Sequence, residues 1–173
     1  MGKKVIKVGL SDSEIEKAIR ELQQYKQDII QKTNLLREKI AKRIEDTSRS
    51  GFGKAVVDDL LKGGQRKANV SVSLTNKGDV SIVIADGEDA IWAEFGAGVY
   101  HNGSAGTSPH PKGAELGFTI GDYGKGQGKK QVWGFYDGDE LQLTHGAPAT
   151  MPMYNAVKTV CEEIVKIARE VFK

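Results

Sequence analysis

One uninterrupted helical pattern, running from Ser11 to Gly51, constrains this chain more than any other feature. Its apolar residues recur at spacings of three, four and seven, the periodicity of an amphipathic helix, and no glycine or proline interrupts them. The Ser11-Asp-Ser-Glu14 sequence predicts a capping box at the start of the helix. The apolar stripe comprises Ile15, Ile19, Leu22, Ile29, Leu36, Ile40 and Ile44.

The predicted length of this helix has a structural consequence. About 35 residues of helix are roughly 50 Å long, which exceeds the width of a domain of this size. We therefore expect part of the helix to project from the core or to pack on another molecule. The repeat allows a coiled coil, and it also fits a helix that lies across its own sheet and runs past the edge.

Two apolar boxes frame the middle of the chain. The first is Trp92-Ala-Glu-Phe-Gly-Ala-Gly98, and the second is Gly146-Ala-Pro-Ala-Thr-Met-Pro-Met-Tyr154. The segment 96–130 between them holds ten glycines and few aliphatic residues, so it cannot bury a core of its own. The sequence predicts a long, flexible loop here. A rigid body with such a projecting loop suits a protein that binds neighbouring proteins better than an enzyme that encloses a substrate.

The remaining segments predict an α+β fold in a single domain, 1–173. Residues 1–62 are expected to be helical, with further turns at 54–61 after the glycines that end the long helix. Residues 68–95 predict a β-hairpin and a short helix at 90–95, and residues 131–173 predict a second hairpin and a C-terminal helix that begins at Pro152. Together they predict an antiparallel sheet of about four strands, packed by the N-terminal and C-terminal helices, with the Gly-rich loop at 96–130.

Composition excludes several classes of protein. The 173 residues carry a net charge of +2, which does not favour nucleic-acid binding through bulk charge. The single cysteine excludes an internal disulfide framework and fits a reducing compartment. No apolar run reaches the length of a transmembrane helix, and the N-terminus lacks the pattern of a signal peptide. We therefore expect a soluble protein, made in the cytosol, without membrane contact.

No motif for catalysis, a cofactor or a metal stands out. The three histidines, His101, His110 and His145, lack the helical spacing of zinc ligands. Glu94 lies between Trp92 and Phe95, so its carboxylate is expected among buried aromatic residues and must find a partner. We expect a cap, or an ion pair within or between subunits, rather than a catalytic group.

Two alternatives remain open from the residues alone. One is a nucleic-acid-binding module that uses the basic Gly-rich loop together with a nearby basic pair. Its residues are Lys125, Lys129, Lys130, Arg66 and Lys67. The other is a hydrolase that uses His101, His110 and Glu94.

The order of these features resembles the HK97 gp10-like family of tailed-phage tail-component and head–tail joining (tail completion) proteins. The shared features are a long N-terminal helix, a hairpin, the first box, a variable glycine-rich loop, and a proline-rich second box that opens the last helix. The first box supplies Glu94, Phe95, Gly96 and Gly98, and the second supplies Pro148, Ala149, Pro152, Met153 and Ala156.

The resemblance implies a structural part of a phage or prophage virion, made in the bacterial cytoplasm, with no catalytic activity and no cofactor. It implies a ring of copies of the chain, a hexamer, in contact with tail-tube or neck proteins, whereas contact with DNA is not favoured. The residues expected to carry assembly or structural contacts are Trp92, Glu94, Phe95, Gly96, Gly98, Pro148, Met151, Pro152, Met153 and Tyr154.

Overall fold

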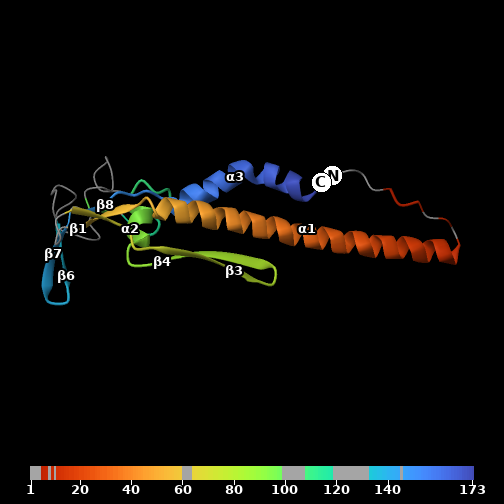
Figure 1. The fold of residues 1–173 in the computed structure, drawn as a ribbon, viewed down its shortest axis with the longest axis horizontal. Coiled ribbons are helices and arrows are strands. Elements are labelled where there is room, and N and C mark those ends of the chain that lie inside the picture. The colour runs from red at the N-terminus through yellow and green to blue at the C-terminus, as the bar shows by residue number, and fades with distance from the viewer. Residues whose placement is uncertain are drawn as a thin grey trace.

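The computed structural model describes residues 5–7, 9, 11–59, 64–98, 108–118, 133–144 and 146–173. It is an α+β fold with a long N-terminal helix and a C-terminal helix, as the sequence predicted (Figure 1). The helices are α1 (Asp12–Phe52), α2 (Ala90–Phe95) and α3 (Pro152–Val171). The strands are β1 (Val56–Asp59), β2 (Gly64–Lys67), β3 (Ser71–Lys77), β4 (Val80–Asp86), β5 (Ala97–Gly98), β6 (Trp133–Asp137), β7 (Glu140–Thr144) and β8 (Gly146–Ala147).

Helix α1 forms a straight shaft along the molecule. Its 41 residues are about 60 Å long, whereas a compact globule of this chain length is about 40 Å across. At its start the Glu14 carboxylate accepts hydrogen bonds from the Ser11 hydroxyl at 2.6 Å and from the Ser11 backbone N–H at 3.4 Å. These bonds lower the pKa of Glu14. The helix ends at Phe52, where the Gly53 N–H donates to the Arg49 carbonyl at 2.9 Å.

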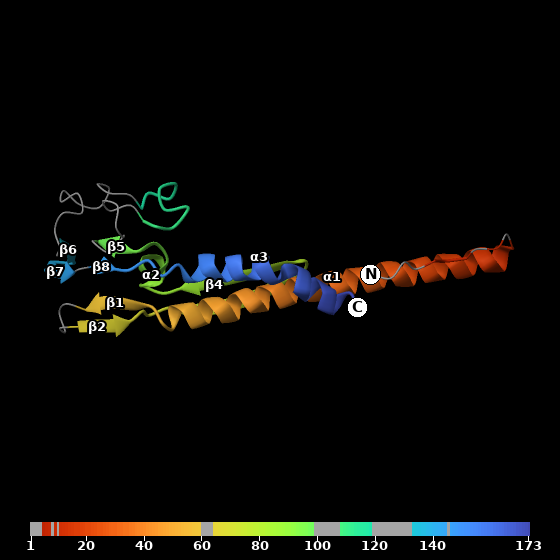
Figure 2. The same cartoon turned by 90° about the horizontal axis from the view of Figure 1, so that it is seen from above.

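Helix α3 packs antiparallel along the C-terminal half of α1. A Cβ on Gly51 would lie only 2.9 Å from Cβ of Pro152, so glycine permits the close approach at the start of α3. Further along, Arg43 of α1 donates to both carboxylate oxygens of Glu163, each at 3.0 Å. Figures 1 and 2 show that α3 ends near the middle of α1, so the N-terminal half of α1 extends beyond it.

The β3–β4 hairpin lies along α1 on a different side from α3 (Figure 1). Its antiparallel register pairs Thr75 with Ile82, and Gly78 in the turn has a φ of 57°, which favours glycine. A small core forms where α1, the hairpin and α2 meet, and its buried members are Phe52, Ala55, Val72 and Ala93. Arg49 of α1 also donates to the Val72 carbonyl at 2.9 Å.

Residues 56–59 form a strand, although the sequence predicted helical turns at 54–61. Strand β1 pairs with β2, and Val57 is buried. Two consecutive β-branched residues after the helix end favour an extended chain, which explains the error. Arg66 of β2 donates to the buried carboxylate of Asp89, with one contact at 3.0 Å, and this bond ties the ladder to the start of α2.

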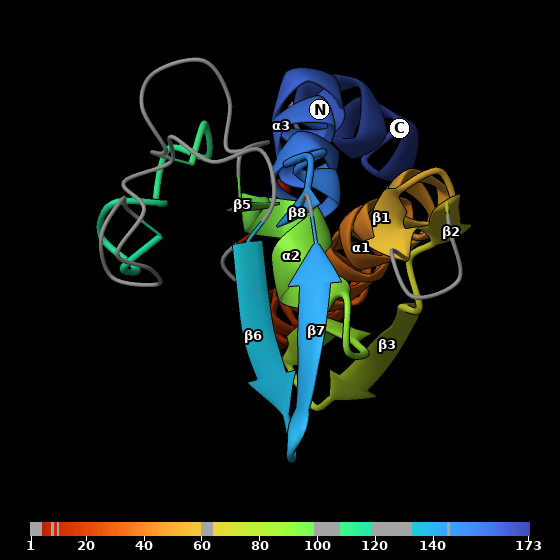
Figure 3. The same cartoon turned by 90° about the vertical axis from the view of Figure 1, so that its left-hand side faces the viewer.

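The described strands form four separate two-stranded antiparallel ladders, β1–β2, β3–β4, β5–β8 and β6–β7, instead of one sheet of about four strands. Both predicted hairpins are present, and the prediction of α2 at 90–95 is confirmed. The two hairpins do not join, because β3–β4 lies along the shaft of α1 and β6–β7 lies at one end of the molecule (Figures 1 and 3).

Candidate functional site

The two apolar boxes lie against each other. Strand β5 pairs with β8, with Ala97 opposite Ala147 and Gly98 opposite Gly146. Next to this ladder, the Ala93 carbonyl accepts hydrogen bonds from the backbone N–H of Thr150 at 2.9 Å and of Met151 at 3.2 Å. The Thr150 hydroxyl donates to the same carbonyl at 3.1 Å. Residues more than fifty positions apart in the sequence therefore form one junction, which we call the box junction (residues 92–98 and 146–154).

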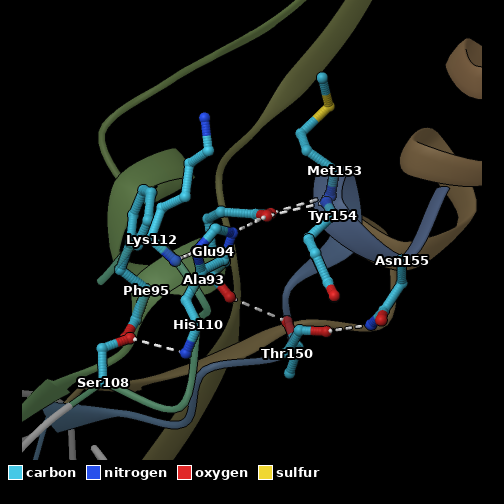
Figure 4. Close-up of polar contacts among 10 residues, drawn as sticks. All are labelled: Ala93, Glu94, Phe95, Ser108, His110, Lys112, Thr150, Met153, Tyr154 and Asn155. Atoms are coloured by element: carbon cyan, nitrogen blue, oxygen red, sulfur yellow. Dashed lines mark hydrogen bonds and ion pairs between the residues drawn. The ribbon is translucent and has the colours of Figure 1, made fainter. Parts of the chain in front are cut away.

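Glu94 holds the centre of the box junction (Figure 4). One carboxylate oxygen accepts from the Met153 N–H at 2.8 Å, and the other accepts from the Tyr154 N–H at 2.9 Å. Both donors belong to the first turn of α3, where backbone N–H groups have no partner within the helix. A buried anion at this end also interacts favourably with the helix dipole. The carboxylate therefore caps α3, which is one of the two structural roles predicted for it.

The chain enters α3 through an unusual backbone conformation. Met151, the residue before the helix, has a φ of 50° and a ψ of 51°, the left-handed region that non-glycine residues seldom adopt. Pro152 follows in the first turn and is buried. Proline has no N–H, so it leaves none unsatisfied there, and the next two N–H groups point to Glu94. Two bonds to the Ala93 carbonyl hold Thr150 and Met151 in place.

His110 reaches Glu94 from the Gly-rich segment. Its Nδ1 accepts a hydrogen bond from the Lys112 backbone N–H at 3.0 Å, so the proton of the neutral ring lies on Nε2. That Nε2 lies 3.3 Å from the Glu94 carboxylate, and both side chains are about nine-tenths buried. The His110 ring therefore lies within ion-pair distance of the Glu94 carboxylate.

Residues 108–118, which belong to the predicted flexible loop, contact α2. Ser108 is buried, and its hydroxyl donates to the Phe95 carbonyl at 2.6 Å. The Ser108 N–H donates to the Phe118 carbonyl at 3.2 Å, which closes the segment on itself. Within the predicted loop, residues 99–107 and 119–130 lie outside the described residues.

Aromatic rings link residues 108–118 to both segments of the box junction. The Phe95 and Phe118 rings stack with centroids 4.3 Å apart and an interplanar angle of 3°. His110 lies tilted on Phe95 with centroids 4.4 Å apart, and the Tyr154 ring meets it edge to face at 5.3 Å. Charge capping, hydrogen bonding and ring packing thus hold α2, residues 108–118 and α3 together.

The structure brings the predicted site residues together at one place. The Trp92 carbonyl accepts a hydrogen bond from the Gly96 N–H at 2.8 Å, and Gly96 has a φ of 79°, a conformation that glycine adopts readily. Pro148 is half-buried after β8, and Met153 packs partly buried against the core. Tyr154 is more exposed, at 38%.

Sequence reasoning missed the structural roles of Ser108, Thr150 and Phe118. The first two carry one weak signal, because a hydroxyl residue beside a proline or a helix start often bonds to the backbone. Nothing in the sequence indicated the stacking of Phe118 on Phe95.

The open alternatives gain little from this geometry. Of the proposed hydrolase residues, Glu94 and His110 do lie together, but backbone N–H groups of α3 already occupy both carboxylate oxygens. His101 and His145 lie outside the described residues, as do Lys125, Lys129 and Lys130. Arg66, expected in a basic patch, is bound to Asp89.

The described residues hold neither a candidate metal site nor a candidate membrane-spanning helix. No group of three or more histidine, cysteine, aspartate or glutamate side chains there is placed to hold a metal ion. No helix in the described part of the chain combines the length and apolar character needed to cross a bilayer.

The fold and the junction define an elongated α+β protein in which a buried carboxylate clamps two distant segments. Comparison with known proteins gave no match to a family model, to a curated protein or to a solved structure. The family resemblance drawn from the two boxes therefore stays an expectation.

Proposed function

We propose that this chain is a structural protein of a tailed-phage or prophage virion, of the tail completion or head–tail connector kind. In this role it assembles with copies of itself into a ring, a hexamer, and contacts neighbouring tail-tube or neck proteins. It acts through subunit contacts and not through catalysis.

The exposed half of α1 is the observation that carries this proposal. Beyond the end of α3, the apolar stripe of α1 continues into solvent, with Ile15 42%, Ile19 49% and Leu22 55% exposed. Aliphatic side chains at helical spacing are a binding face for another polypeptide. Helix α1 is longer than the rest of the fold is wide, and its free half carries this apolar face. Such a helix suits a subunit that packs against a neighbouring subunit.

The box junction supports the same conclusion. The buried Glu94 carboxylate accepts hydrogen bonds from two N–H groups of α3 and lies 3.3 Å from Nε2 of His110. A general acid or base needs a free oxygen in reach of a substrate. A carboxylate used in this way serves to hold α2, α3 and residues 108–118 in a fixed relation.

The virion role is tested by locating the protein. Tailed particles released by induction of the strain that encodes the chain are purified, and their proteins are identified by mass spectrometry. We expect the chain in the particles, and antibody labelling in electron micrographs at the neck or tail. Intact particles that lack the chain would refute the virion role.

Ring assembly is tested on the purified full-length protein by native mass spectrometry and negative-stain electron microscopy. We expect concentration-dependent rings that Leu22→Glu weakens. Gln24→Glu is the control, because it adds the same charge to the same helix away from the apolar stripe. Equal assembly of both variants, or a monomer at every concentration, would count against the ring.

A further inference from the structure

The outer face of β4 carries a row of exposed aliphatic side chains. Val80 is 50% exposed, Ile82 42% and Ile84 49%, while the alternate residues of the strand face the body of the protein and are half-buried. Figure 1 shows α1 on one side of the hairpin, and no labelled element covers the other side. The larger side chains of β4 therefore point away from the protein's own core.

The two strands of the hairpin differ sharply on this outer face. Opposite Ile84, Ile82 and Val80, strand β3 places Ser73, Thr75 and Lys77, all exposed. The apolar row is thus confined to β4 and does not spread over the ribbon.

The backbone edge of β4 lies beside this row. Among the described strands, β4 pairs with β3 alone, so its second edge has no strand partner. Natural edge strands are commonly protected by lysine, proline or a bulge, which prevent pairing with another chain. Residues 80–85 contain no charged residue and no proline, and their register with β3 is continuous. An unprotected edge beside an apolar row is suited to strand pairing.

We propose that β4 pairs edge to edge, antiparallel, with β4 of a second copy of this chain, around a two-fold axis at Ile82. In this register Ile82 faces its own copy, and Val80 faces Ile84 of the second copy in both directions. Every exposed aliphatic of the row then has an aliphatic partner on the same face. The product is a four-stranded antiparallel sheet, β3–β4–β4–β3.

Self-complementarity of the row identifies the occupant. An isologous contact requires a surface that matches itself after a two-fold rotation. The row of three aliphatic residues centred on Ile82 meets this requirement. Two-stranded ribbons are marginal alone, and three or more strands stabilise them. The contact is smaller than a standard interface, so we expect a dimer that dissociates on dilution. This inference uses β4 and does not rest on the virion role.

The first test places a charge at the proposed axis. Ile82→Lys puts two ammonium groups opposite each other across the interface, and Thr75→Lys puts the same charge on the same face of β3, away from the paired edge. By sedimentation equilibrium, we expect Ile82→Lys to raise the dissociation constant of the dimer by tenfold or more and Thr75→Lys to leave it within about twofold. Equal effects, or a monomeric parent protein at every concentration, would overturn the proposal.

The second test reads the register directly, and it decides the matter if Ile82→Lys does not fold. Cys161 is exposed, so it is first replaced by serine. In this background Ile82→Cys is expected to form a disulfide dimer under mild oxidation, because the two thiols lie opposite each other. Val80→Cys alone is expected to cross-link at less than about a tenth of that rate. Equal rates, or no cross-link at residue 82, would refute this pairing.

Discussion

Glu94 is a buried charge whose bonds all run to other segments. Its carboxylate binds two N–H groups of α3 and the His110 ring. Replacement by glutamine keeps the shape and removes the charge. It also places the NH2 group of the amide against one of the two backbone N–H donors of α3, so that two donors face each other. We expect Glu94→Gln to lower the free energy of unfolding by about 2 kcal/mol, measured by urea titration. Glu88→Gln is the control, at an exposed position between β4 and α2. It should change the free energy of unfolding by less than about 0.5 kcal/mol.

A different outcome would change the role of this residue. If Glu94→Gln were as stable as the parent protein, the carboxylate would not clamp the junction, and a role in binding an external group would become the better explanation.

His110 fastens residues 108–118 to α2 through Glu94, Phe95 and Tyr154. Loss of the ring removes these contacts at once, and a segment with few contacts opens locally more often. We expect His110→Ala to increase the rate of trypsin cleavage after Lys112 at least tenfold, followed by mass spectrometry of the peptides. Glu115→Ala, an exposed change in the same segment, is the control. An unchanged rate would show that other contacts hold the segment.

At the scale of elements, the long helix and the hairpins followed from local signals. Capping residues, helical periodicity, glycine turns and alternation act over a few residues, so they are legible in the sequence. The strand β1 and the division into two-stranded ladders were not predicted. Both depend on which segments meet, although the double valine at 56–57 is a local signal for β1.

The ion pair between Arg43 and Glu163 joins α1 to α3. The Arg43 guanidinium holds the pKa of Glu163 below its ordinary value of 4.5. A carboxyl group whose pKa is lower in the folded protein stabilises the fold above the unfolded value, and this contribution is lost as the pH falls through the folded pKa. Because both groups are solvent-exposed, we expect a small effect.

The stability lost in Glu163→Gln should depend on pH. Between pH 7 and about pH 5, Glu163→Gln should unfold at a slightly lower temperature than the parent protein, and below about pH 4 the difference should shrink and then vanish. Thermal unfolding of both proteins from pH 7 to pH 3 measures this. Glu162→Gln, for which the structure describes no ion pair, should show no such narrowing. If the difference in unfolding temperature between Glu163→Gln and the parent protein stayed constant from pH 7 to pH 3, the ion pair would not link the helices.

At the scale of the whole molecule, stability and exposed apolar surface lie in different places. Phe52 is 2% exposed in the small core, whereas Leu22 on the free half of α1 is 55% exposed. We expect Phe52→Ala to cost about 3 to 5 kcal/mol of unfolding free energy. Leu22→Ala should cost less than about 0.5 kcal/mol in the monomer. Urea titration at low protein concentration measures both.

The same pair of variants separates folding from assembly. Leu22→Ala should weaken the concentration-dependent ring assembly proposed for α1 while it leaves the monomer intact. If Leu22→Ala were as destabilising as Phe52→Ala in dilute protein, the free half of α1 would belong to the core and would not be a docking face.

The sequence by itself determined the elements with strong local signals: the shaft of α1, the two hairpins, α2 and the start of α3 at Pro152. It also singled out Glu94 and the two boxes as residues that needed partners. Only the tertiary structure decided that Glu94 caps α3, that His110 joins it, and that the hairpins stay apart. These outcomes depend on contacts between residues from 16 to 60 positions apart, and no local pattern specifies which distant N–H group a carboxylate will meet.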